Sequence, residues 1–196
     1  MSLCGKVFKD FSNPCVLSVT GFKQIGVLIN LDDIENKTIN LPDFNNGTCD
    51  YTIEFNLKCE TKGFKIQAID AGTAIKGYVD KSRNDNGYPQ YTHHVDIILS
   101  GLDKDLNCFL ASLDSGRYGV ALMTNDGTVV MYGMQNGLTT GDYTYDIVEG
   151  GGSAVITLSS LENAPESTLP LIYKADGGST EILDFESAFA GITPCP

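Results

Sequence analysis

Two apolar segments, 118–124 and 128–134, flank the sequence Asn125-Asp126-Gly127 and constrain the fold more than any other feature. An Asp-Gly pair between segments rich in β-favouring residues is typical of a tight β-hairpin. Both faces of this predicted hairpin are apolar, so both faces must be covered. The cover is either the subunit's own core or a neighbouring subunit, and the pattern fits both alternatives.

The side chains of this hairpin are the candidate assembly residues. If a neighbouring copy covers them, we expect the contact to involve Tyr118, Val120, Leu122, Val129, Met131 and Tyr132. If the subunit covers them itself, the same six residues only fill its core.

Other segments also predict strands. Between 51 and 57, apolar Tyr51, Ile53, Phe55 and Leu57 alternate with polar residues, as in a strand with one buried face. Further strands are expected at 15–31 (two, with a break near Gly21), 37–41, 63–69, 92–100, 143–148, 154–158 and 169–174. Turns or polar loops are expected at 32–36, 43–50 and 81–87.

Two short helices complete the prediction. Apolar residues recur at helical spacing within 103–113, with Asp103 as the candidate N-cap, and a short terminal helix is expected within 181–190. The fold class is therefore mainly β, a sandwich or barrel with one or two short helices. We divide the 196 residues into an N-terminal arm (1–14), a β domain (15–176) and a C-terminal tail (177–196) that holds the possible helix.

Charge limits the possible partners. The sequence contains 13 Lys and Arg residues and 25 Asp and Glu residues, which gives a net charge of −12 at pH 7. This balance argues against a surface that grips the phosphate backbone. It fits simple solubility, and it also fits a channel wall along which DNA slides without sticking. No apolar run reaches the roughly 18 residues of a membrane span, so no membrane partner is expected.

The six cysteines form no closely spaced pair and no secretory signal precedes them, so reduced thiols are expected. Cys108 falls within the helical apolar pattern, which predicts a core position. His93 and His94 are adjacent, and on a strand they point to opposite faces, so they do not suit one metal ion. No metal or cofactor is predicted.

Motifs for catalysis are missing from the sequence. It contains no G-x-S-x-G elbow, no phosphate-binding Walker loop and no G-x-G-x-x-G. Acidic residues are plentiful, but no two stand out as a glycosidase pair. We therefore expect no catalytic residue, and a non-enzymatic protein.

The segment Tyr132-Gly133-Met134-Gln135-Asn136-Gly137-Leu138 follows the Asp-Gly turn. After it come a glycine-rich stretch, a strand at 154–158, and Glu162-Asn163-Ala164-Pro165 in place of a Glu-x-Pro-like segment. In this order of features, residues 116–173 resemble virion structural proteins of tailed bacteriophages, especially those of the crAss-like group that infect Bacteroidetes. The residues at 162–165 depart from the family's order.

This resemblance implies a tail-tube-like β fold and a subunit that self-assembles into a ring of the tail or neck, where it forms part of the DNA conduit. It implies partners that are copies of the chain and adjacent tail or neck proteins, with loops 43–50 and 81–87 meeting adjacent rings. DNA would pass without specific binding, and the protein would reside in the virion after synthesis in the host cytoplasm. The alternative is a β-sandwich binding or adhesion module on the virion that takes a receptor or glycan.

Overall fold

The computed structural model describes residues 21–43, 50–67, 74–100, 104–146, 153–176 and 179–190. The predicted N-terminal arm (1–14) lies outside them. In the described part of the chain, twelve strands join one hydrogen-bonded sheet, and two short α-helices accompany it, so the mainly β prediction is confirmed. Neither helix is long and apolar enough to cross a membrane.

The strands are β1 (Phe22–Asn30), β2 (Ile34–Asn40), β3 (Thr52–Leu57), β4 (Phe64–Gln67), β5 (Ile75–Arg83), β6 (Pro89–Ser100), β7 (Tyr118–Thr124), β8 (Val129–Tyr132), β9 (Leu138–Thr140), β10 (Thr144–Asp146), β11 (Ser153–Ser160) and β12 (Leu171–Tyr173). The helices are α1 (Lys104–Leu113) and α2 (Glu181–Glu186), and a 3₁₀ turn spans Leu31–Asp33.

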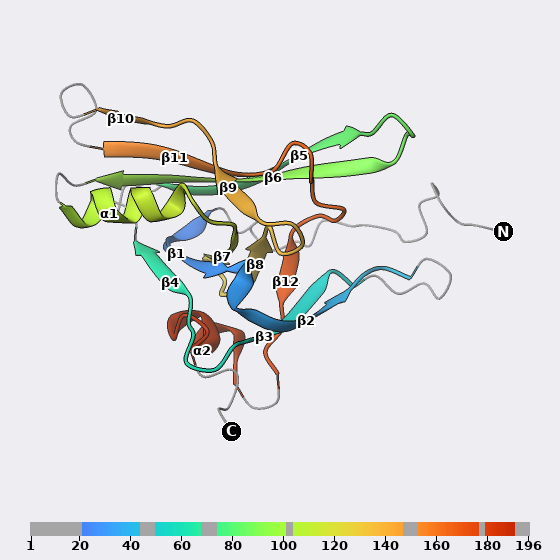
Figure 1. Ribbon diagram of the computed structural model, residues 1–196. Coiled ribbons are helices and arrows are strands. Elements are labelled where there is room, and N and C mark those ends of the chain that lie inside the picture. The colour runs from blue at the N-terminus through green and yellow to red at the C-terminus, as the bar shows by residue number, and fades with distance from the viewer. Residues whose placement is uncertain are drawn as a thin grey trace.

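The main path through the sheet runs β2-β3-β12-β8-β7-β9-β11-β6-β5. Outside this path, β1 pairs with β4 and β7, and β10 pairs with β11. Among the described pairs, β3 and β12 run parallel and the others run antiparallel. Figure 1 shows β10, β11, β6 and β5 as an upper layer above β1, β7 and β8, with β12, β3 and α2 below. Strands β2 and β5 lie at opposite ends of the path.

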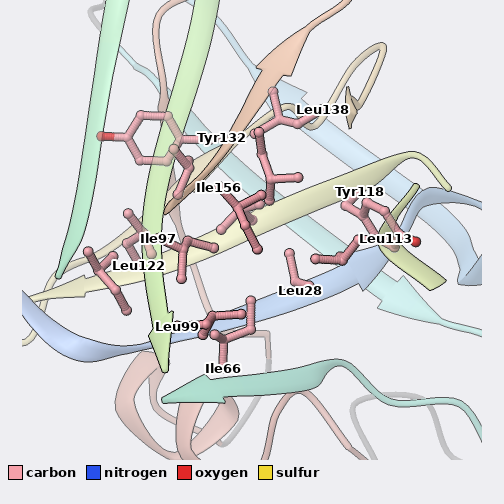
Figure 2. Close-up of a cluster of buried hydrophobic side chains, with 14 of the residues drawn as sticks. Leu28, Ile66, Ile97, Leu99, Leu113, Tyr118, Leu122, Tyr132, Leu138 and Ile156 are labelled. Atoms are coloured by element: carbon pink, nitrogen blue, oxygen red, sulfur yellow. The ribbon is translucent and has the colours of Figure 1, made fainter. Parts of the chain in front are cut away.

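The sheet encloses two hydrophobic cores that share one wall. Core 1 lies between the upper layer, α1 and strands β1, β4, β7 and β8 (Figure 2). Core 2 lies between β1, β7 and β8 on one side and β3, β12 and the α2 segment on the other. We call strands β1, β7 and β8 the shared wall, because each sends side chains into both cores.

Alternation along the shared wall explains its apolar sequence. On β7, Val120 and Leu122 point into core 1, whereas Ala121 and Met123 point into core 2. On β1, Leu28 belongs to core 1 and its neighbours to core 2. Successive side chains of a strand face opposite ways, so a strand between two cores must be apolar at every position.

The described part of the predicted C-terminal tail, residues 179–190, packs into core 2. Phe185, Ala188 and Phe189 are buried there, and the Phe189 ring lies 5.2 Å from that of Phe55 and 5.1 Å from that of Tyr173. The hydroxyl of Thr180 accepts a hydrogen bond from the N–H of Leu183 and caps α2. Residues 179–190 therefore complete the second core.

Two strands are longer than predicted. The polar segment 81–87 was expected to be a loop, but β5 continues to Arg83 and only the next residues turn back. The polarity of residues 81–83 fits an edge strand whose side chains are exposed. In the same way β2 begins at Ile34, directly after the 3₁₀ turn, and includes residues predicted to be a turn.

The cysteine predictions are wrong at two positions. Cys59 takes part in a disulfide, although reduced thiols were expected. Cys108 is exposed on α1, although a core position was expected. The buried side of α1 is formed by Leu110 and Leu113, which places Cys108 on the solvent side. The other four cysteines and the candidate N-cap Asp103 lie outside the described residues.

Candidate functional site

The six predicted assembly residues all lie inside the subunit. Tyr118, the most exposed of them, retains 7% of its accessible surface. Four of the six belong to core 1 and two to core 2: Tyr118, Val120, Leu122 and Tyr132 in the first, Val129 and Met131 in the second. The structure thus brings them together as core, the alternative that the sequence left open. Any assembly surface of the folded subunit therefore lies elsewhere.

The segment that carries the phage resemblance forms a turn held by a buried carboxylate. Gly133 and Gly137 have positive φ angles of 67° and 88°, a conformation that favours glycine. Between them, the N–H of Gln135 donates to Glu166 Oε2 at 3.1 Å and the N–H of Asn136 donates to Oε1 at 2.9 Å. Glu166 is 1% exposed. Its carboxylate thus accepts from two partly buried backbone donors of the turn.

Side chains of the same turn also form hydrogen bonds with the residues on either side of Glu166. Asn136 Nδ2 donates to the carbonyl of Pro165 at 2.8 Å. Gln135 Oε1 accepts from both the N–H and the hydroxyl of Ser167. Burial raises the pKa of Glu166, while the backbone N–H groups of the turn and the ammonium of Lys37 oppose that rise. The two parts of the resemblance, the glycine turn and the segment after Glu162, therefore hold one another in place.

His93 fixes the start of this turn. Its Nδ1 accepts from the N–H of Gly133 at 3.1 Å, so Nε2 carries the proton and donates to the carbonyl of Thr168 at 2.8 Å. Burial lowers the pKa of His93, which is 2% exposed. Because both ring nitrogens are engaged, His93 acts as a neutral structural residue.

His94 points the other way, as predicted for adjacent residues on a strand. It stacks on Tyr78 with ring centroids 4.7 Å apart, and its Nε2 lies 3.3 Å from Asp80 Oδ2. Lys76 Nζ lies 4.4 Å from the centroid of the Tyr78 ring on the same outer face. The two histidines therefore share no ligand site. Among the described residues, no group of three or more His, Cys, Asp and Glu side chains is placed to hold a metal ion.

The first exposed candidate is the end of the β5–β6 hairpin, residues 81–91, which we call the hairpin tip. Figure 1 shows it projecting from the upper layer, away from α1. Most of its side chains are exposed, and Tyr88 keeps 69% of its accessible surface. Its turn is well ordered internally: Asn84 Oδ1 accepts from the N–H groups of Asn86 and Tyr88, and Arg83 Nη1 donates to the carbonyl of Gly87 at 3.0 Å.

Strand β5 is the last strand of the main path, and no other described strand pairs with its outer edge. The N–H of Asn84 donates to Tyr88 and the carbonyl of Ala74 accepts from Ile98, so even-numbered residues of β5 direct their backbone groups toward β6. Odd-numbered residues, including Val79, Lys81 and Arg83, direct theirs away from β6. The side chains of Lys81 and Arg83 share one face, two residues apart.

The second exposed candidate is a polar pocket of about 520 Å³ between β2, β3 and the α2 segment. We call it the acidic pocket, because Glu54, Asp176 and Asp184 line it against one cation, Lys174. The remaining lining residues are Asn36, Thr38, Phe55, Asn56, Tyr173, Ser179, Leu183, Ser187 and Ala190.

The inner wall of the acidic pocket is fixed by hydrogen bonds. Asp184 is buried, and its carboxylate accepts from the Tyr173 hydroxyl at 2.8 Å and from the Ser179 hydroxyl at 2.5 Å. Burial raises the pKa of Tyr173, which therefore stays a donor to Asp184. Glu54 and Asp176 have neither a hydrogen bond nor a salt bridge within the described residues. These two carboxylates are available to a ligand.

Sequence reasoning missed Glu166 and the acidic pocket. A glycine turn with inward N–H groups signals the need for an acceptor, but which of 25 acidic residues supplies it depends on the fold. The pocket combines residues from four separate segments. No protein family matches this chain, and neither a curated protein nor a solved structure matches it.

Proposed function

We propose that this chain is a structural subunit that assembles with copies of itself into a ring of a bacteriophage tail or neck, as part of the DNA conduit and without catalytic activity. The position in the virion rests on the resemblance of residues 116–173. Assembly rests on one structural observation: a well-ordered hairpin tip that projects from the body with its side chains exposed.

A projecting hairpin gains little stability from its own subunit. Isolated two-stranded hairpins are marginal in water, because they bury too little apolar surface. Contact with a second protein would supply that burial. The outward backbone groups of Lys81 and Arg83, which pair with no described strand, also offer hydrogen bonds to a partner, and the charges of these side chains discourage pairing with arbitrary strands.

Charge favours a partner like the chain itself. Residues 75–91 carry three cationic and two anionic side chains, whereas the whole chain has a net charge of −12. A weakly basic projection on an acidic protein is attracted to the acidic surface of another copy.

A virion binding module for a receptor or glycan is the second candidate. The acidic pocket favours it, because amide, hydroxyl and carboxylate groups line the pocket and can pair with sugar hydroxyls. A stable monomer that binds a glycan would support this candidate over self-assembly.

The test compares the wild type with a shortened hairpin. Replacing residues 83–89 by Asn-Gly joins Ser82 to Gln90, which are paired across the strands, through a two-residue turn, and it leaves the contact between Tyr91 and Glu166 intact. Light scattering over a range of concentrations and negative-stain images should show rings for the wild type and monomers for the variant. Lys104→Ala, on exposed α1, is the matched control and should assemble normally.

Circular dichroism distinguishes a failed assembly from a failed fold, since the shortened variant should keep its β spectrum. A wild type that stays monomeric at every concentration, alone and with purified tail proteins, contradicts the proposal.

A further inference from the structure

We infer that the acidic pocket is the receptor for the hairpin tip of a second copy, and that it recognises the guanidinium of Arg83 and the ammonium of Lys81. This inference rests on the proposed function and names the contact through which neighbouring subunits are joined.

The pocket presents carboxylates that form no ion pair within the described part of the chain. Glu54 and Asp176 form no salt bridge among the described residues, and Lys174, the one cation in the lining, forms none either. Unpaired carboxylates around a concave surface attract a cation, and charge-assisted hydrogen bonds to that cation offset the cost of displacing their water. A sulfate or phosphate group would be repelled.

The hairpin tip presents the complementary charge. Lys81 and Arg83 are exposed and form no salt bridge among the described residues. Arg83 donates one N–H to the carbonyl of Gly87, and this hydrogen bond holds the side chain beside the turn. The other N–H donors of the guanidinium remain available. A guanidinium fork fits a carboxylate through two parallel hydrogen bonds, so it suits Glu54 or Asp176.

The hairpin tip and the acidic pocket also both expose apolar side chains. Leu183 lines the acidic pocket and is 58% exposed, and Ile182 beside it is 41% exposed. Tyr88 stands at the end of the tip. An exposed tyrosine on one partner and exposed aliphatic side chains around a pocket on the other form the kind of anchor that dominates interface energies.

The arrangement directs the tip to another copy. Strand β5 and the β2–β3 pair lie at opposite ends of the main strand path. In Figure 1 the tip projects from the upper layer while α2 lies at the bottom. The contact is therefore head-to-tail, and repetition of a head-to-tail contact produces a closed ring or an open filament.

Charge reversal provides the test. Arg83→Glu and Glu54→Arg should each raise the apparent dissociation constant of assembly by about tenfold or more, and the double variant should recover most of that loss, because it restores opposite charges across the interface. Lys76→Glu changes the same strand on its outer face, beside Tyr78, and should leave assembly unchanged. Sedimentation velocity at two salt concentrations measures the wild type and the four variants, and the wild-type contact should weaken at high salt.

The outcomes separate the two proposals. If the shortened hairpin abolishes assembly while Glu54→Arg has no effect, or if the double variant fails to recover, the tip binds elsewhere and this inference is overturned, whereas self-assembly stands. If wild type never assembles, both fail. Recovery in the double variant supports both.

Discussion

Strand β7 and the hairpin tip belong to two hairpins with opposite surroundings. β7 is apolar at nearly every position and lies between two cores of its own subunit. The tip is polar on both faces and projects into solvent. The comparison shows that two-sided apolarity marks the interior when a chain has enough strands to cover both faces. The apolar strands of this chain are therefore covered by its own side chains.

The largest effect is expected in the shared wall. Leu122→Ala removes a fully buried side chain from core 1, and the remaining cavity should lower the free energy of unfolding by about 2–5 kcal/mol. Urea unfolding followed by circular dichroism measures this change. A loss below 1 kcal/mol would mean that β7 is less enclosed than the structure has it.

The contact between Glu166 and the glycine turn should come next. Glu166→Ala removes a buried carboxylate and the acceptor of the partly buried N–H groups of Gln135 and Asn136, which should cost about 1–3 kcal/mol. Glu162→Ala, four residues earlier and exposed, is the matched control and should change stability by less than about 0.5 kcal/mol. Equal effects at the two positions would contradict the buried contact.

Titration of His93 should have a smaller effect that depends on pH. Its pKa in the folded protein is lowered below 6.5, so the unfolded chain binds the proton more readily. Stability is fully present above pH 6.5 and declines as the pH falls from there toward the lowered pKa, with a slope of up to about 1.4 kcal/mol per pH unit. Comparing the pH dependence of urea unfolding for wild type and His93→Gln isolates this contribution, and identical profiles would contradict it.

The smallest effect on stability is expected at the tip. Tyr88→Ala should change the free energy of unfolding by less than about 0.5 kcal/mol, because the side chain is exposed and only its backbone is bonded. Assembly, measured by light scattering, should nevertheless weaken. A large loss of stability with normal assembly would mean that Tyr88, like the side chains of β7, stabilises its own subunit and makes no contact with another copy.

Local patterns predicted the local elements. The Asp-Gly turn identified the β7–β8 hairpin, and alternation identified β3, whose Ile53, Phe55 and Leu57 are all buried. Helix α1 was found by its spacing, but the same spacing misplaced Cys108, because only Leu110 and Leu113 of that helix are fully buried.

Features that depend on distant partners were not predicted. The polar residues of β5 resemble a loop until β6 is known to pair with them. The role of Glu166 depends on a turn that lies about thirty residues earlier in the chain. The acidic pocket exists only where β2, β3, β12 and the α2 segment meet, so no single segment of sequence contains its signal.

The shared wall also determines when this protein can fold during its synthesis. Val27 on β1 pairs with Ala121 on β7, and core 2 is complete only when Phe189 has packed against Phe55. Strand β1, which is apolar on both sides, therefore stays unpaired until strands much later in the sequence have been synthesised. Such long-range pairing is slow, and the exposed apolar strand makes the nascent chain prone to aggregation. Folding is thus delayed until the segment that ends with Phe189 has left the ribosome, because core 2 lacks its last aromatic ring before then.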